Sequence, residues 1–312
     1  MTHVYALADA HLDSPSLVTI GVFDGVHKGH QELIHRVVSS AQANGCASVV
    51  LTFHPHPDVV MGGINERYYL TTPEQRAQLL KDMGVDLVVT QTFDLDLRQM
   101  RAANFVDQLL EHLNMKWLWV GEDFALGYQR EGNVDFLRQY GQDHDFSVEA
   151  VPLLQYRSGD TVVSSSRIRE MLAAGEVDTV HEWLGRAYSV MGEVVKGDQR
   201  GRTIGFPTAN LNVWQQQVVP AHGVYAGWAI LDGERHMAVT NIGTRPTFEG
   251  DYVTVEAHLL DFDRDIYGHT VELSFEKHLR SEMKFSGIDA LVAQIKSDAE
   301  SARTYLSQQA SG

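Results

Sequence analysis

The chain has 312 residues, with 25 Lys and Arg against 41 Asp and Glu, which gives a formal net charge of −16. Its 44% hydrophobic and 21% charged residues are ordinary for a folded protein and exclude the disordered and fibrous classes. An acidic chain offers no general basic surface to nucleic acid or to a membrane, so we expect neither as a partner. At about 150 residues per domain, the length predicts two domains.

The cysteine content and the lengths of the apolar runs indicate the compartment. Cys46 is the single cysteine, so no intrachain disulfide forms and a reducing cytosol fits. The N-terminus has no basic segment followed by an apolar core, and no run approaches the roughly 18 apolar residues of a membrane span. We therefore predict a cytoplasmic protein with small-molecule partners and at most weak self-association.

Short apolar runs alternate with helical patterns in the N-terminal half. The runs, rich in Val, Ile, Leu and Phe as in strands buried on both faces, are Leu17–Phe23, Ala47–Phe53, Val85–Phe93, Trp117–Gly121 and Phe146–Leu154. Thr72-Pro73-Glu74 predicts the start of a helix that ends at Gly84, and residues 102–113 carry a helical apolar stripe. The alternation predicts a parallel sheet, which binds ligands beyond the carboxyl ends of its strands.

The pattern changes near Gly185-Arg186-Ala187, where strand candidates follow one another without helices. They are separated by glycine-bearing turns and comprise Tyr188–Val195, Gly223–Leu231, His236–Ile242, Val253–Leu260 and Thr270–Phe275. We predict a small antiparallel β-barrel and a final amphipathic helix over residues 287–306, with an apolar face of Ile288, Leu291, Val292, Ile295 and Ala299. The predicted domains are residues 1–186 and 187–312.

A glycine-bounded turn with two histidines follows the first predicted strand. Residues 19–30 read TIGVFDGVHKGH, and a helix is predicted to begin near Gln31. Gly21 and Gly25 let the backbone approach a phosphate, the helix start offers unpaired amides, and His27 and His30 add donors. A lone histidine beside a glycine would be an ordinary surface turn. Strand, glycines, two histidines and helix start in this order are typical of nucleotidyltransferases, which stabilise charge on an attacked α-phosphate.

Three serines precede another predicted helix in the segment VSSSRIREML, residues 163–172. One serine is enough to cap a helix, so the surplus hydroxyls are available to a phosphate. Arg169 stands in the first helical turn and can donate two parallel N–H groups to a triphosphate. The segment is therefore a second candidate phosphate contact.

Four N-terminal segments, GVFDGVHKGH, TFHPHP, GEDFALGYQREGN and VSSSRIREML, resemble in this order the adenylyltransferase module of the bifunctional bacterial riboflavin kinase/FMN adenylyltransferase (FAD synthetase) family. The match covers residues 17–186 and implies a Rossmann-like α/β nucleotidyltransferase domain of HxGH type, which transfers AMP from ATP to FMN and releases pyrophosphate. Ser166 replaces the family's threonine, and Ala125-Leu126 depart from the usual arginine or serine followed by phenylalanine. By position, the resemblance implies that ATP is bound and activated by Gly21, Phe23, Asp24, Gly25, His27, His30, Asp123, Ser165, Ser166 and Arg169.

A second glycine-rich loop opens the predicted barrel and closes on Pro207-Thr208-Ala209-Asn210. Backbone amides of such a loop can surround phosphates without a helix. Strand alternation places Thr208 and Asn210 on one face, where a hydroxyl and an amide oxygen suit a largely hydrated Mg²⁺. Standing alone, this segment would be an ordinary turn that enters a strand.

One carboxylate, Glu256, stands in the otherwise apolar strand Val253–His258. It is either a general base, which takes a hydroxyl proton while that oxygen attacks a γ-phosphate, or a residue that faces solvent outside the barrel. The strand pattern alone leaves both interpretations open.

Five C-terminal segments, VVKGDQRGRTIGFPTANL, GVYAG, NIGTRPTF, VEAHLLDFDRDIYG and LRSEMKF, resemble the riboflavin kinase module of the same family. The match covers residues 186 to about 306, with Lys196 where histidine is frequent and Ala187 where proline is frequent. By position it implies Glu256 as the base, Arg280 in a loop over the flavin, Thr208 and Asn210 at the metal, and an ATP site that includes Gly201, Thr203, Gly205 and Pro207.

The two motif sets predict one enzyme with two ATP-dependent transferase activities and Mg²⁺ as cofactor. The C-terminal domain would convert riboflavin to FMN, and the N-terminal domain would convert FMN to FAD. The alternatives are a chain active only as the kinase, an HxGH nucleotidyltransferase with another phosphate acceptor, and a flavin-binding or sensory protein without chemistry. The GFPTAN segment argues against the second alternative, and the intact candidate catalytic residues argue against the third.

Overall fold

The computed structural model describes residues 2–152, 157–158, 161–197, 201, 204–247 and 250–310. It divides by compactness into two units, Met1–Ser165 and Ser166–Gly312. Helices α7 (Ser165–Ala174) and α8 (Val177–Leu184) thus fall almost wholly in the second unit, whereas the sequence-based boundary at residue 186 assigns them to the first. Within the described residues, no helix is long and apolar enough to cross a membrane.

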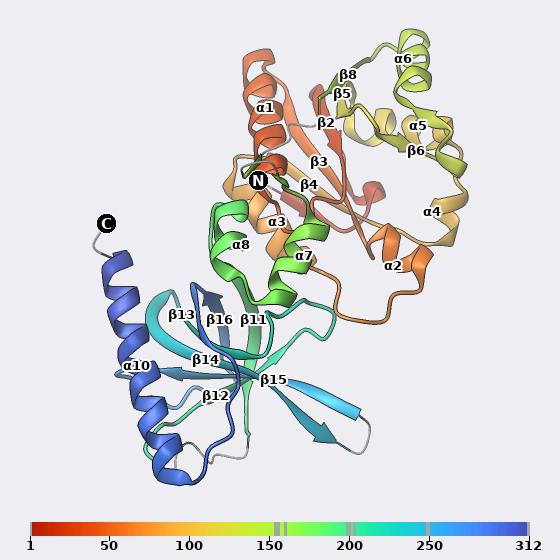
Figure 1. Ribbon diagram of the computed structural model, residues 1–312. Helices are drawn as coiled ribbons and strands as arrows, with labels where there is room; N and C mark the ends of the chain where they lie inside the picture. Colours follow the sequence, from red (N-terminus) through yellow and green to blue (C-terminus); the bar gives the residue numbers. More distant parts are fainter. Residues whose placement is uncertain are drawn as a thin grey trace. The chain divides into compact units, whose positions relative to one another are not determined.

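A six-stranded parallel sheet forms the centre of the N-terminal unit (Figure 1). Its spatial order is β1-β4-β3-β2-β5-β8, and its strands are β1 (Thr2–Val4), β2 (Ser16–Ile20), β3 (Ala47–His54), β4 (Leu87–Thr92), β5 (Met115–Gly121) and β8 (Ser147–Val151). All pairings are parallel, so the predicted parallel sheet is confirmed. The chain builds outward from β2 through β3 and β4 and then returns to place β5 on the other side. This reversal puts the ends of β2 and β5 at the position where such sheets bind ligands.

Helices cover both faces of this sheet. The regular ones are α1 (Lys28–Asn44), α2 (Pro57–Gly62), α3 (Pro73–Asp82), α4 (Leu95–Gln99), α5 (Ala102–Leu113) and α6 (Val134–Asp143). Short elements complete the unit: η1 (Leu7–Asp9), β6 (Ala125–Leu126), η2 (Tyr128–Arg130), β7 (Gly132–Asn133), β9 (Arg157–Ser158) and β10 (Thr161–Val162). The start of α3 is confirmed, since Thr72 and Gln75 form a capping box and Pro73 occupies the first turn.

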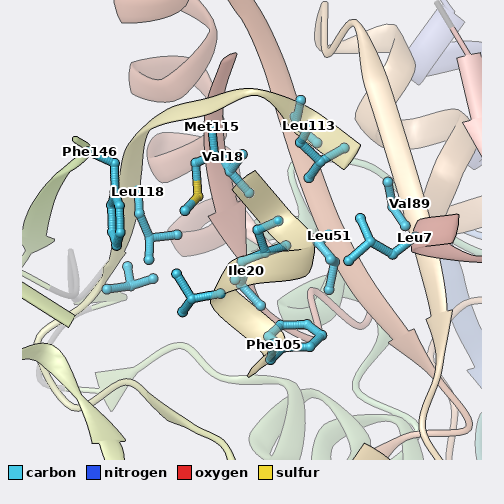
Figure 2. Packing of buried hydrophobic residues seen from close by; sticks show 14 of the residues in the cluster. Leu7, Val18, Ile20, Leu51, Val89, Phe105, Leu113, Met115, Leu118 and Phe146 are labelled. Carbon is cyan, nitrogen blue, oxygen red and sulfur yellow. The ribbon is translucent and has the colours of Figure 1, made fainter. Parts of the chain in front are cut away.

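Alternate residues of each central strand pack in opposite directions, which explains the nearly continuous apolar runs. Figure 2 shows the larger core, where Ile20 and Leu51 of the sheet pack with Phe105 of α5. On the other face, Val50 packs in a core that includes Ile34 of α1 and Leu80 of α3. The sheet is therefore rigidly held on both sides, and its strand ends are fixed supports for the loops that follow.

The C-terminal unit is an antiparallel barrel, as predicted. Its strands are β11 (Tyr188–Val195), β12 (Ala209–Val213), β13 (Gly223–Leu231), β14 (Glu234–Thr247), β15 (Gly250–Leu259), β16 (Thr270–Phe275) and β17 (Lys277–Arg280). The order β14-β15-β12-β11-β16-β13 closes because β13 also pairs with β14, and β17 adds to β13. Closure satisfies the backbone groups that an open edge would expose.

Helix α10 (Ile288–Ala310) packs on the barrel, but its apolar face was only partly predicted. Ile288 is 67% exposed, and the buried contacts come from Ala302 and Leu306 near the other end of the helix. Leu291 and Ile295 border a cavity instead of the core. The apolar pattern of α10 extends into its first turn, which the barrel core does not cover.

Candidate active sites

The loop between β2 and α1, residues 21–27, is folded tightly enough to require glycine at two positions. A Cβ on Gly21 would lie 2.8 Å from the Phe23 ring, and one on Gly25 would lie 2.7 Å from Leu70. Phe23 has φ +51° and Val26 has φ +42°, in the left-handed region that bulky and β-branched residues rarely adopt. Such a conformation persists only when the surrounding structure holds it. We call residues 21–30 the histidine loop, because it includes the start of α1.

His27 and His30 lie side by side at the start of α1. His27 is the N-cap, and its Nδ1 accepts the backbone N–H of His30 at 3.4 Å. The two rings stack with centroids 3.6 Å apart, and Phe23 meets His30 edge-on at 5.3 Å. The helix begins at Lys28, three residues before the predicted start, so His30 belongs to its first turn. The pair therefore stands where unpaired helix amides favour an anion.

The environment of His30 keeps its imidazole neutral. Burial, followed by the effects of His27 and Arg76, holds the pKa of His30 well below 6.5. Its Nδ1 is buried without a hydrogen-bond partner among the described residues. A neutral imidazole with an unsatisfied buried nitrogen is suited to accept or donate one further hydrogen bond.

Asp24 is held from within the protein and is only 1% exposed. Its carboxylate accepts the backbone N–H groups of Leu70 and Thr71 at 3.0–3.1 Å and the Thr71 hydroxyl at 3.1 Å. Its backbone carbonyl accepts the Ser165 hydroxyl at 2.8 Å. Asp24 and Ser165 thus connect the histidine loop to two other segments.

The serine-rich segment begins α7. Ser166 is exposed and Arg169 is half-buried, and both belong to the C-terminal unit. The histidine loop lies in the other unit, so the role of Ser166 and Arg169 as ligands of a triphosphate stays a prediction.

A cavity of about 740 Å³, the sheet-edge cavity, lies at the carboxyl ends of the parallel strands. Gly21 follows β2, Phe53 is the last but one residue of β3, Phe93 follows β4 and Asp123 follows β5, and all of them line it. The structure therefore brings two predicted site residues, Gly21 and Asp123, to one cavity. No sequence motif marked several other lining residues, which lie in or next to the short helix α4: Phe93, Leu97, Arg98 and Met100.

A second cavity, of about 310 Å³, lies over the start of β12 and is called the PTAN cavity. Pro207, Thr208 and Asn210 line it together. Gly197 also lines it, and a Cβ there would lie 2.4 Å from the Asn210 amide nitrogen. Gly197 was not a predicted site residue, although it stands in the glycine-rich loop. Its missing side chain leaves Asn210 room for its present position.

The other loop glycines shape the turn before β12. The Gly201 carbonyl accepts the backbone N–H groups of Ile204 at 3.2 Å and Phe206 at 2.8 Å, and a Cβ on Gly201 would lie 2.2 Å from the Phe206 oxygen. Gly205 has φ +86°. Thr203, a predicted ATP contact, lies outside the described residues.

Glu256 lines a third cavity, of about 340 Å³, which we call the Glu256 cavity. On β15 it pairs in register with Asn210 of β12 and Asn241 of β14, so the three side chains share one face of the sheet. Its side chain is 27% exposed, and its Oε1 lies 3.8 Å from Nη2 of Arg245. Thr208 lines both this cavity and the PTAN cavity. A carboxylate thus stands beside the candidate metal ligands.

Arg280 lines the Glu256 cavity and is held by helix α10. Its Nε and Nη2 donate to the Asp298 carboxylate at 2.8–3.1 Å, and Asp298 is 5% exposed. Asn241 and Arg245 stand in the NIGTRPTF segment, so a sequence signal existed for them. Asp298 had none, because one acidic residue in a helix usually faces solvent.

Comparison with known proteins gives a separate family match for each half of the chain. Residues 9–167 match a family model described as FAD synthetase, and residues 184–306 match one described as riboflavin kinase. The chain is 35% identical to the bifunctional riboflavin kinase/FMN adenylyltransferase of Listeria monocytogenes, over 96% of this chain and 95% of that one. It is 36% identical to the Escherichia coli protein of the same description, over 93% and 92%. A solved structure described as a macrolide-efflux protein from Streptococcus pneumoniae superposes with a TM-score of 0.87 at 31% identity, over 97% and 98% of the two chains.

Proposed function

The chain belongs to the bifunctional riboflavin kinase/FMN adenylyltransferase family, and from this membership we infer that it makes FMN from riboflavin and ATP and then FAD from FMN and ATP. One observation supports two centres above all others. The histidine pair lies in the N-terminal unit, whereas the row of Asn210, Glu256 and Asn241 lies in the C-terminal barrel.

In the barrel, the nucleophile is the terminal hydroxyl of the riboflavin side chain. Glu256 accepts its proton while the oxygen attacks the γ-phosphorus of ATP, and ADP leaves. The partly buried position of Glu256 on the cavity wall supports this role. The flavin occupies the Glu256 cavity, where Arg280 and Phe285 form part of the wall. The nucleotide occupies the PTAN cavity, whose lining includes the aromatic rings of Phe262 and Tyr267.

The oxygens of Thr208 and Asn210 fit a magnesium ion at the boundary of the two cavities. Both line the PTAN cavity, and the absence of a side chain at Gly197 keeps the Asn210 amide in place. Two neutral oxygens suit Mg²⁺, which keeps several waters and takes further ligands from phosphates. When bound, Mg²⁺ would neutralise charge on the triphosphate. Thr208 and Asn210 would hold this ion and so help to orient the nucleotide.

In the N-terminal unit, the nucleophile is the phosphate of FMN, which attacks the α-phosphorus of ATP and releases pyrophosphate. His27 and His30 hydrogen-bond the phosphate oxygens whose charge grows during attack. The amides at the start of α1 and the Ser165 hydroxyl bind the triphosphate. Ser166 and Arg169 are further ligands that the family resemblance implies. Asp24 stabilises the conformation of the histidine loop, to which Phe23 and Gly25 also belong. The flavin ring takes the sheet-edge cavity, whose aromatic lining includes Phe53, Phe93, Phe124 and Tyr128.

The chain acts in the cytoplasm on small molecules. Its single cysteine and its acidic charge support this proposal over a secreted, nucleic-acid-binding or membrane-binding protein.

A crossed assay with two variants tests the proposed function. Purified protein with riboflavin, ATP and Mg²⁺ should form FMN and then FAD. Chromatography of the flavins measures both products. Glu256→Gln should lose nearly all FMN formation and still convert supplied FMN to FAD, whereas His30→Ala should accumulate FMN. Folded wild-type protein that forms neither product would reject the function. Loss of both activities in each variant would reject two separate centres.

A further inference from the structure

Arg76 is an unusual residue for the interior of this protein. It lies on α3, has no solvent exposure and is the largest of the fully buried side chains among the described residues. Its neighbours on the buried face of α3, Ala77 and Leu80, belong to an apolar core. A buried guanidinium is costly unless it is paired and hydrogen-bonded, so its contacts show what it holds.

Arg76 contacts the strand ends that support the histidine loop. Nη1 donates to the Val22 carbonyl at 2.8 Å, the Thr52 hydroxyl at 3.0 Å and the Phe53 carbonyl at 3.2 Å. The Thr52 hydroxyl in turn donates to the Val22 carbonyl at 2.7 Å. Nη2 lies 3.7 Å from the Asp24 carboxylate. One side chain therefore connects α3, the end of β3 and the loop after β2.

The histidine loop needs such support. Between Val22 and His27 the chain passes through Phe23 and Val26, both at positive φ, and Asp24 connects to the segment before α3. Arg76 contacts the two anchor points of this path, the Val22 carbonyl and the Asp24 carboxylate. A loop held at both points presents His27 and His30 in one arrangement before substrate binds.

We propose that Arg76 is a positioning residue of the N-terminal centre, which acts through Val22, Thr52 and Asp24 to fix the histidine loop for adenylyl transfer. The proposal rests on the proposed function, since it names the support of that same site. The charge of Arg76 also contributes to the lowered pKa values of His30 and His54, which agrees with its closeness to the loop.

The test measures both activities of Arg76→Met in the full-length chain. We expect kcat for FAD formation from FMN to fall about 100-fold, as for other small displacements of catalytic groups, with the KM values for ATP and FMN within about threefold. Arg76 contacts the cavity residues Val22 and Phe53 through their backbone carbonyls, so the side chains that line the sheet-edge cavity are kept and the KM values change less than kcat. Riboflavin kinase activity should stay within about twofold, because its centre lies in the other unit. Hydrogen exchange of the N-terminal unit, compared with the wild type, reports that the unit carrying Arg76 is folded. Arg138→Met, at a half-exposed arginine on α6 that pairs with Asp135, is the matched control and should leave both activities unchanged.

Thr52→Val supplies a second test that keeps the shape of a buried side chain. It removes the hydroxyl between Arg76 and Val22, and we expect about a tenfold fall in kcat for FAD formation. This variant decides the question if Arg76→Met does not fold. Full adenylylation in either folded variant, or a rise in KM without a fall in kcat, would overturn the proposal. An inactive wild type would instead reject the proposed function.

Discussion

The two halves of this chain handle ATP with different structural elements. In the N-terminal unit, the candidate phosphate-binding groups follow a parallel strand, and two histidines stand at the start of the helix that comes next. In the C-terminal unit, they lie on a loop and a barrel strand, and a carboxylate pairs in register with the candidate metal ligand. Glycine makes room in both places, at Gly25 and at Gly197.

The difference follows from the two nucleophiles. A hydroxyl must lose its proton to attack a phosphorus, so the kinase centre needs a base, and Glu256 is the base that we propose. A phosphate monoester has a second pKa near 6 and is already ionised at neutral pH. The adenylyltransferase centre that we propose therefore needs no base, and histidines that hydrogen-bond the growing charge are enough. The predictions below separate the two centres, from the largest expected effect to the smallest.

Glu256→Gln should affect the kinase centre alone. We expect kcat for FMN formation to fall about 1000-fold, because the amide cannot take the proton, while the KM for ATP changes little. Adenylylation of supplied FMN should equal that of the wild type. A coupled ADP assay measures the first activity and flavin chromatography the second. Kinase activity within tenfold of the wild type would show that Glu256 is not the base.

His30→Ala should affect the other centre alone. We expect kcat for FAD formation to fall about 100-fold or more, since one donor to the transition state is lost. Arg36→Ala is a suitable control, because Arg36 is on the same helix, is half-exposed and pairs with Glu32. An equal fall in both variants would point to a disturbed helix instead of lost catalysis.

Gly197→Ala should weaken nucleotide binding in the barrel without removing the base. The new Cβ would displace the Asn210 amide, because it would otherwise lie 2.4 Å from its nitrogen. We expect the KM for ATP in the kinase reaction to rise about tenfold, a loss near 1.4 kcal/mol. Steady-state kinetics over a range of Mg²⁺ concentrations measures this effect, and adenylylation serves as the internal control. An unchanged KM would contradict the role given to Asn210.

The buried His30 should make the N-terminal unit less stable in mild acid. Its pKa in the folded state lies below the 6.5 of an unfolded chain, so the unfolded state binds more protons as the pH falls through this window. Stability should therefore fall below about pH 6.5, with a slope of at most about 1.4 kcal/mol per pH unit from this residue. Hydrogen exchange of the N-terminal unit at several pH values, in the wild type and His30→Asn, measures the slope. Identical slopes would contradict it.

The regular elements were predicted where the local pattern was strong. The ends of β11, β13 and β16 match the predicted residues, because strict strand patterns meet glycine turns there. The three-residue strand β1 was missed, since it pairs only at the sheet edge and carries no periodicity. The strand β14 is longer than predicted, because its pairing with β15 continues through polar residues up to Thr247.

Motifs predicted the residues of the candidate sites, but no motif predicted the residues that hold them in place. The buried face of α3 consists of Pro73, Arg76, Ala77 and Leu80. A charged residue at one position of this otherwise apolar stripe was the available sequence signal for Arg76. Asp298 had no such signal, because its partner Arg280 is distant in sequence and only the fold brings them together. Buried polar pairs of this kind depend on tertiary structure, which local patterns do not contain.

The number of nucleotides bound per chain tests the two-centre account most directly. Calorimetric titration of the folded chain with a non-hydrolysable ATP analogue in the presence of Mg²⁺ should give two equivalents. Gly197→Ala should weaken one of them and leave the other as it is. A single equivalent in the wild type would contradict the account, because one of the two halves would then hold no ATP.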